Sequence, residues 1–234
     1  MHRACFTEKG WKILNKFTGI FNKYRAVLAG GTALALQLGH RISLDLDFFT
    51  DKPFKVEAII SDIRKTGTSF RILSESKEHL TLDVEGIKLS LFRYEYPFLQ
   101  KPTIFENISI AGILDIAAMK IIAINQRGTK RDFIDLYCIL QELPFHKIAD
   151  HMVKRFGRER INAVNIGKSL VYFTDAESEP EPRYPEGKAI ILWEAVKKFF
   201  EKHVKQMVLD MDIATKEDKK LSRGGTSTKQ SNLT

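Results

Sequence analysis

Residues 28–50 read LAGGTALALQLGHRISLDLDFFT, and this stretch decides the predicted fold. An apolar run over residues 26–29 stops at Gly30-Gly31, which predicts a short buried strand ending in a tight turn. Good helix formers fill residues 32–38, and Gly39 ends that short helix. Residues 44–49 then alternate Asp with Leu and Phe, as a strand does. The stretch therefore predicts a strand, a glycine turn, a helix and a second strand.

The glycine turn is a candidate phosphate site. A backbone without side chains at Gly30 and Gly31 lets a phosphate approach closely, and the N-terminus of the following helix offers free N–H groups and a positive dipole end. Thr32 could cap that helix or touch the phosphate. The alternative is a tight turn before a capped helix with no ligand.

Asp45 and Asp47 are the candidate metal ligands. They lie two residues apart on the predicted strand, so both carboxylates are expected on one face. Such carboxylates repel each other unless a cation lies between them, and hard oxygen ligands suit Mg²⁺. A two-ion site could hold the attacking and leaving oxygens of a phosphoryl displacement. The alternative is a strand whose solvent face carries two aspartates.

The sequence resembles the nucleotidyltransferase AbiEii/AbiGii toxin family, a branch of the DNA polymerase β-like nucleotidyltransferase superfamily. The resemblance covers residues 25–140 and is carried by two ordered blocks. The first block comprises Gly30, Gly31, Thr32, His40, Arg41, Ser43, Asp45, Asp47, Phe48 and Phe49. The second comprises Met119, Lys120, Arg127, Arg131, Asp132, Phe133, Ile134, Asp135, Leu136 and Tyr137.

The resemblance implies an activity and a set of site residues. The expected reaction moves a nucleoside monophosphate from a nucleoside triphosphate (NTP) to an acceptor. The resemblance suggests RNA as that acceptor, at the 3′ end of a transfer RNA. Asp45 and Asp47 would bind Mg²⁺, and Asp132 would be a polar contact or proton acceptor. The expected nucleotide-binding residues are Gly30, Gly31, Thr32, Arg41, Ser43 and Lys120. The family also implies the role of a toxin that a cognate antitoxin protein neutralises.

One position departs from the superfamily pattern. The superfamily usually has a third carboxylate on a neighbouring strand, often as the base that activates the acceptor hydroxyl. The expected strand, residues 86–94, carries Ser90 at that position. Asp83, Glu85 or Asp132 could substitute for it. If none does, turnover would be slow or absent.

Lys120 and Asp132 also admit simpler explanations. Lys120 lies in an apolar helical run, where a charge is costly unless it finds an anion, but a lysine at a helix edge can extend its amine to water. Lys120→Met is expected to be tolerated because the helix should accept Met. Thr129 and Asp132 fit a helix-capping pair. Asp135 shares a helix face with Asp132 and is expected to pair with Arg131 or Arg127.

The rest of the chain completes an α+β prediction: a polymerase β-like mixed sheet with helices, followed by a C-terminal helical bundle. Residues 1–107 would form the nucleotidyltransferase domain, 108–213 the helical domain and 214–234 a disordered tail. Further strands are expected at 70–73, 80–84 and 87–92, the last two joined by a hairpin at Glu85-Gly86. Helices are expected at 6–24, 56–65, 113–125, 130–142, 145–156, 161–173 and 189–208.

Composition narrows the class of protein. The formal net charge is +8, which favours a polyanionic partner such as a nucleotide or nucleic acid. Lys154, Arg155, Arg158 and Arg160 could follow a nucleic-acid backbone or simply form a solvated helix end. With two cysteines, a framework of several disulfides is not expected. No apolar run has the length or position of a signal-peptide core or a membrane-spanning helix. The expected location of the protein is therefore the cytoplasm. Two other functions stay open: an Asp-x-Asp phosphohydrolase, and a non-catalytic relative that binds nucleotide or nucleic acid.

Overall fold

The computed structural model describes residues 1–224, which divide into two compact units. The first, here the sheet unit, comprises residues 1–119 and 180–191. The second, the helical unit, comprises residues 120–179 and the described residues from Leu192 onward. Within residues 1–224, none of the helices combines the length and apolar character that crossing a membrane would require.

The sheet unit is built on one seven-stranded mixed sheet, in the order β3-β4-β5-β2-β1-β7-β6. The strands are β1 (Val27–Ala29), β2 (Leu46–Thr50), β3 (Arg71–Ser76), β4 (His79–Val84), β5 (Ile87–Arg93), β6 (Thr103–Phe105) and β7 (Ile108–Ile110). The helices are η1 (Arg3–Cys5), α1 (Glu8–Lys23), α2 (Gly30–Leu38) and α3 (Val56–Lys65), and α4 (Ile113–Gln126) begins in this unit.

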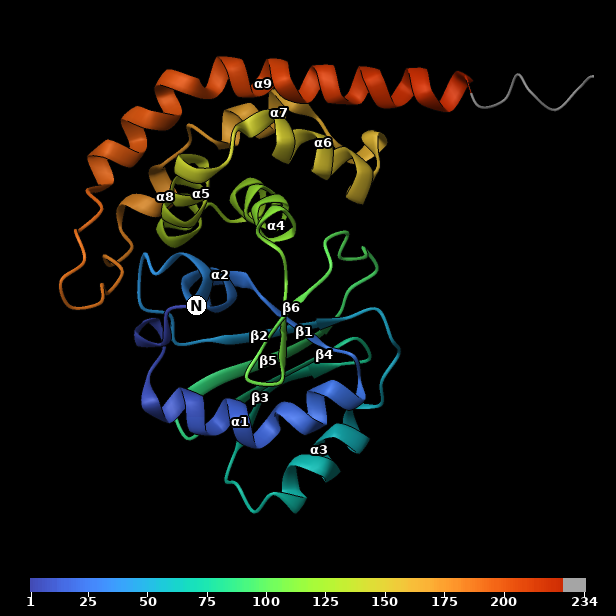
Figure 1. Cartoon of the computed structure of the whole chain (residues 1–234), viewed down its shortest axis with the longest axis vertical. Coiled ribbons are helices and arrows are strands. Elements are labelled where there is room, and N and C mark those ends of the chain that lie inside the picture. Colours follow the sequence, from blue (N-terminus) through green and yellow to red (C-terminus); the bar gives the residue numbers. More distant parts are fainter. Residues whose placement is uncertain (225–234) are drawn as a thin grey trace, which may run out of the picture. The chain divides into compact units, whose positions relative to one another are not determined.

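The two faces of the sheet carry different helices (Figure 1). Helices α1 and α3 lie on one face, where Phe21 of α1 stacks on Phe48 of β2 with ring centroids 4.1 Å apart. Helix α2 lies on the other face. Successive side chains on a strand point to opposite faces, so Asp47, next to Phe48, points to the face that α2 covers.

Two strands were not predicted. Strands β6 and β7 have three residues each and are joined by a two-residue turn at Glu106-Asn107, both with positive φ. Pro102 precedes β6, and three residues are too few to show an alternating pattern. The predicted hairpin at Glu85-Gly86 is confirmed: Val84 pairs with Ile87, and the two turn residues have φ of 52° and 86°.

The helical unit packs around Phe133. Its ring contacts the rings of Phe173, Trp193 and Phe200, with centroids 5.2, 5.8 and 5.6 Å away. The unit contains the C-terminal part of α4, α5 (Lys130–Glu142), α6 (Phe145–Phe156), η2 (Arg158–Arg160), α7 (Ala163–Ser169), α8 (Thr174–Glu177) and α9 (Trp193–Gly224). The bounds of α5 and α6 are those predicted from the sequence.

The predicted tail was partly wrong. Helix α9 continues to Gly224, so residues 214–224 are helical rather than disordered. Met207, Met211 and Ala214 are buried, which extends the apolar stripe of the helix into the polar C-terminal sequence. Residues 225–234, the rest of the predicted tail, lie outside the described residues.

The division into units also differs from the predicted division at residue 107. Strand β7 pairs with β1, so a boundary at residue 107 would remove part of the sheet. The segment 180–191 belongs to the sheet unit, where the carbonyl of Arg183 accepts a 2.7 Å hydrogen bond from the backbone N–H of Ile42.

Candidate active site

The glycine turn and Asp47 meet where β1 ends. Ala29, the last residue of β1, pairs with Asp47 on the antiparallel strand β2. Gly30 follows with φ +67°, a left-handed conformation that favours glycine. A Cβ atom on Gly30 would lie 3.2 Å from Oδ2 of Asp47. The Asp47 carboxylate therefore lies against the N-terminus of α2, as its position in the sequence predicts.

The loop between α2 and β2 brings the other polar residues of the first block to the same corner. Arg41 is 3% exposed, and a Cβ atom on Gly31 would collide with its guanidinium group. The Thr32 hydroxyl lies 2.9 Å from the Ser43 hydroxyl and also donates to the carbonyl of Asp45. This set of seven residues is here called the α2 corner: Gly30, Gly31, Thr32, Arg41, Ser43, Asp45 and Asp47.

The α2 corner combines groups that suit a magnesium-bound phosphate. The helix N-terminus and the Arg41 guanidinium are positive, and the carboxylates are negative. Asp45 and Asp47 are both half-buried. Among residues 1–224 no group of three or more His, Cys, Asp or Glu side chains could hold a metal ion. The two carboxylates nevertheless fit Mg²⁺, which commonly takes one or two carboxylates and completes its shell with phosphate oxygens and water.

Ser90 occupies the position expected for a third carboxylate. Strand β5 runs parallel to β2, and Ser90 is the register partner of Asp47. On the next strand Thr81 pairs with Ser90, and their hydroxyl oxygens are 3.4 Å apart. Ser90 is fully buried. The row beside Asp47 therefore continues with two hydroxyl groups and no acid.

Asp83 and Glu85 are poorly placed to replace that acid. Asp83 lies two strands away from β2, about 10 Å across the sheet. Its carboxylate bonds Arg71 at 2.5 Å and accepts the N–H of Gly86 at 2.7 Å, and Arg71 holds its pKa below the ordinary value. Glu85 lies in the hairpin turn at the end of the same strand.

The second sequence block forms a buried ionic cluster inside the helical unit. The Lys120 amine, on a side chain only 8% exposed, lies 2.7 Å from carboxylate oxygens of both Asp132 and Asp135. Asp132 also accepts hydrogen bonds from Arg127 Nε at 3.0 Å and from the Thr129 hydroxyl at 2.7 Å. Lys120 is therefore not a lysine that extends to water. It pairs with Asp135, a contact that the sequence did not predict.

The surroundings of Asp132 decide its charge state. Burial alone would raise the pKa of Asp132, but the positive charges of Lys120 and Arg127 hold that pKa below its ordinary value. Thr129 also caps α5, accepting the backbone N–H of Asp132, so the predicted capping role is confirmed. A carboxylate held in its ionised form is a weak proton acceptor, which favours a positioning role for Asp132.

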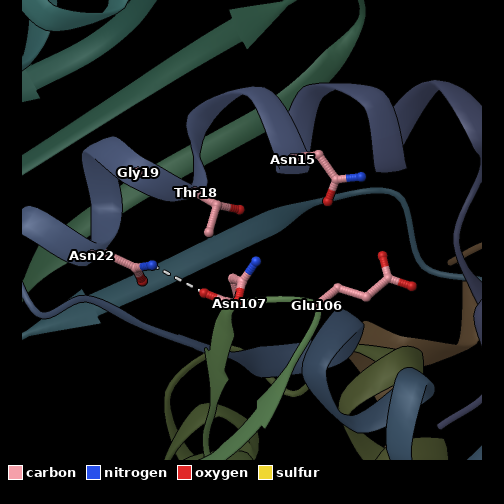
Figure 2. A pocket seen from close by; sticks show the side chains of 6 residues that line it. All are labelled: Asn15, Thr18, Gly19, Asn22, Glu106 and Asn107. Atoms are coloured by element: carbon pink, nitrogen blue, oxygen red, sulfur yellow. Dashed lines mark hydrogen bonds between the residues drawn. The ribbon is translucent and has the colours of Figure 1, made fainter.

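A separate hollow of about 540 Å³ lies between α1 and the β6–β7 turn (Figure 2). Asn22 Nδ2 donates to the carbonyl of Asn107 at 3.0 Å across it. The lining is neutral except for Glu106, so the hollow lacks the positive charge that a phosphate would need. The α2 corner remains the candidate site.

Comparison with known families agrees with this geometry. A family described as "Nucleotidyl transferase AbiEii toxin, Type IV TA system" matches residues 12–110 and 67–221. The chain belongs to the AbiEii nucleotidyltransferase toxin family. An uncharacterized protein of Aquifex aeolicus (strain VF5) is 42% identical to this AbiEii-family chain over 194 residues, covering 80% of the chain and 89% of that protein.

Two solved structures share the fold of this AbiEii-family chain. JHP933 from Helicobacter pylori superposes with a TM-score of 0.51 at 17% identity, covering 93% of this chain and 99% of that one. MenT4, a nucleotidyltransferase toxin from Mycobacterium tuberculosis H37Rv, gives a TM-score of 0.50 at 14% identity, covering 87% and 85%. The predicted family, fold class and enzyme class, a nucleotidyltransferase, are thus confirmed.

Two features of the AbiEii-family site were missed from sequence. One is the burial of Arg41 against Gly31, for which the paired glycines were the available signal. The other is the bond between Lys120 and Asp135, for which the spacing of Asp132 and Asp135 on one helix face was the signal. Each contact joins residues of different elements, and so the pattern named the residues but not their partners.

Proposed function

We propose that this nucleotidyltransferase moves a nucleoside monophosphate from an NTP to RNA, with a transfer RNA 3′ end as the predicted acceptor, and depends on Mg²⁺. The observation that carries the proposal is the α2 corner, where the Asp47 carboxylate, the buried Arg41 and the N-terminus of α2 come together. Fixed positive groups beside a carboxylate suit a magnesium-bound triphosphate.

In the proposed reaction an acceptor hydroxyl oxygen attacks the α-phosphorus of the NTP. A new P–O bond forms, the bond from the α-phosphorus to the bridging oxygen of the β-phosphate breaks, and pyrophosphate leaves with the electron pair. Gly30 and Gly31 would donate backbone N–H groups to the phosphates, while Thr32, Arg41 and Ser43 keep that corner in shape or contact them. The hydroxyl proton would pass to solvent, since Ser90 replaces the usual acid.

Asp45 and Asp47 would hold the metal. Bound Mg²⁺ neutralises phosphate charge and stabilises the developing negative charge in such transfers. A second ion would depend on phosphate oxygens for most of its ligands, because the α2 corner offers two carboxylates.

Lys120 and Asp132 are proposed to act as a pair. Lys120 would contact a phosphate oxygen, and Asp132 and Asp135 would hold its amine in one place. The family description further suggests a cognate antitoxin as partner.

The test is incubation of the protein with each labelled NTP, total RNA and Mg²⁺, followed by sizing of the labelled RNA. A labelled band of transfer-RNA size supports the proposal. Label in RNA of other sizes retains the transferase and corrects the acceptor. Absence of labelled RNA with all four NTPs contradicts the proposal.

A second candidate is a relative that binds NTP without transferring it, and Ser90 is the observation that favours it. The same incubation separates the two, since this candidate predicts NTP binding without labelled RNA. The phosphohydrolase alternative would need a parallel sheet, and the antiparallel pairing of β1 with β2 argues against it.

A further inference from the structure

A pocket of about 300 Å³ lies wholly within the helical unit. Its walls come from the end of α4, the turn that follows, the end of α7, the segment leading into α8 and α8 itself. The volume is at the lower end of the ~300–1,000 Å³ range of ligand pockets, which leaves room for one nucleotide but not for a folded segment.

Two cations face this pocket, Lys168 and Arg127. Lys168 is exposed and has no ion-pair partner among residues 1–224. The Arg127 side chain is 64% exposed although its Nε bonds Asp132. Asp175 is the carboxylate in the lining. A cation without a partner beside a second, exposed cation is an arrangement that attracts a phosphate group.

Tyr172 supplies an aromatic surface. Its side chain is 55% exposed, whereas the next residue, Phe173, packs its ring against Phe133 and Trp193 in the core. Within the described residues Tyr172 has no aromatic contact. A flat ring left open beside cations is the typical platform for a nucleic-acid base.

Two carboxamides complete the lining, Asn125 and Gln126 at the end of α4. Asn125 Oδ1 accepts a 2.8 Å hydrogen bond from the Ser169 hydroxyl, which fixes the amide and directs its NH₂ group elsewhere. Carboxamides can donate to and accept from the edge of a base, and in single-stranded RNA those edges are accessible.

The charged groups that line the pocket favour a nucleotide within an RNA strand over a free NTP. The α2 corner places two carboxylates together for a magnesium ion, whereas this pocket has one carboxylate, Asp175, and two cations. Its two cations suit one phosphodiester. The basic residues near Gly157 are less available, because Arg155 is buried and Arg158 pairs with Glu159 and Asp218 at 2.8 and 3.7 Å.

The geometry points to this pocket as a binding subsite for one nucleotide of single-stranded RNA, with its base on Tyr172 and its phosphate beside Lys168 and Arg127. The inference rests on the proposed function, because it assigns the pocket to the acceptor strand of that reaction. Arg127 also bonds Asp132, so an occupied pocket would touch the Lys120 cluster directly.

The test measures binding of a fluorescein-labelled, single-stranded eight-nucleotide RNA to the full chain by anisotropy, without NTP. Tyr172→Ala should raise Kd about five- to hundredfold, because stacking on an aromatic ring is lost. Tyr172→Phe keeps the ring and should bind like the wild type. Lys168→Ala should raise Kd and reduce the slope of log Kd against log salt by about 0.7, the value for one phosphate of a single strand.

Two further variants sharpen the result. Asp175→Asn should tighten binding, because it removes a negative charge near the phosphate. Lys147→Ala is the control, an exposed lysine of the helical unit outside the pocket lining, and should keep the wild-type slope apart from general screening. Wild-type Kd for both Tyr172→Ala and Lys168→Ala overturns the inference, as does equal binding of a duplex of the same length, whose bases are hidden.

The outcome is separable from that of the proposed function. If the wild-type chain binds RNA through Tyr172 but transfers no label to RNA, the subsite is supported and the transferase proposal is contradicted. If the chain labels RNA and Tyr172→Ala leaves the KM for RNA unchanged, the transferase proposal is supported and the subsite is contradicted. NTP-induced thermal stabilisation should be the same in Tyr172→Ala and the wild type.

Discussion

Asp47 of the α2 corner and Lys120 of the helical unit are both charged, but their surroundings differ. Asp47 is half-buried beside Gly30, where it can take a cation. Lys120 is buried and already faces two carboxylates at 2.7 Å. A substitution at Asp47 should therefore change ligand binding, whereas one at Lys120 should change the stability of the fold as well.

Asp47→Asn is expected to abolish nucleotide transfer and to leave the fold intact. The amide lacks the charge that holds Mg²⁺ but has nearly the shape of the carboxylate, so the chain should still fold. Asp51→Asn is the matched control, since this exposed aspartate follows the same strand and pairs only with Lys52 at 3.1 Å among the described residues. Transfer to labelled RNA and circular dichroism check the result. Full transfer by Asp47→Asn would remove its metal role.

Lys120→Met is expected to destabilise the protein by about 3–5 kcal/mol, because the two buried carboxylates of Asp132 and Asp135 lose the amine that bonds both of them. The sequence predicted that Met would be tolerated because the surrounding helix is apolar. That reasoning did not include the two carboxylates that contact Lys120. Urea unfolding measures the change, and the exposed control Lys147→Met should shift stability by no more than about 0.5 kcal/mol. Adding Asp132→Asn and Asp135→Asn to Lys120→Met should recover much of the loss. A Lys120→Met protein as stable as the wild type would show that the cluster contributes little.

Among single residues, the position of Asp47 beside Gly30 could be predicted from sequence because it follows from local conformation. Strand period and glycine conformation alone bring Asp47 to Gly30. The Lys120 cluster could not, since Asp132 and Asp135 lie on a different helix and only packing shows which cation they meet. The absence of a third acid was visible in the sequence, and the register of Asp47 with Ser90 now supports it.

Helix α2 depends on the left-handed residue at its start. Gly30→Ala should cost about 1–2 kcal/mol, because a Cβ atom is disfavoured at φ +67° and would crowd Asp47. Gly19→Ala is the control: Gly19 lies inside α1 with nothing within 4 Å of the added atom, so this change should stabilise by about 0.5–1 kcal/mol. Thermal unfolding compares the two variants. Equal stability of both would show that the turn can relax.

The ionic cluster of Lys120 in α4 with Asp132 and Asp135 in α5 should make the protein less stable in acid. The pKa of Asp132 is lower in the folded chain than its ordinary value of 3.8, so its stabilising contribution is fully present above pH 3.8. That contribution is lost as the pH falls through the folded-state pKa. Urea unfolding at pH 7 down to pH 3 measures it, and Asp132→Asn should show a shallower decline. An identical decline in both proteins would contradict the assignment.

The helices and strands that could be predicted have a clear period of apolar residues or a capping residue. Helix α5 was predicted with its observed bounds because Thr129 caps it and its apolar residues recur at helical spacing. Strands β6 and β7 could not be predicted, since three residues carry no period and the pairing of β7 with β1 joins segments far apart in sequence. Helix α9 extends past the predicted end because Met211 and Ala214 find buried positions that composition does not reveal.

For the whole molecule, the chain passes between the two units at residues 119/120, 179/180 and 191/192. A linear division such as 1–107 and 108–213 therefore cannot separate two independent folds. The return of residues 180–191 to the sheet unit follows from contacts such as that between Ile42 and Arg183, which no local pattern encodes. Function should accordingly be tested on the full chain.

The last prediction concerns stabilisation of the full chain by its proposed substrate. A ligand that binds only the folded state at a hundred times its Kd stabilises by about 2.7 kcal/mol, which corresponds to a rise in Tm of roughly 5–10 °C for a chain of this size. We expect this rise with Mg²⁺ and the correct NTP together, because Asp45 and Asp47 would bind the metal and the α2 N-terminus the phosphates. Excess chelator or Asp47→Asn should abolish it, whereas Asp51→Asn should retain it. A rise that survives both chelator and Asp47→Asn would mean that the nucleotide binds somewhere other than the α2 corner.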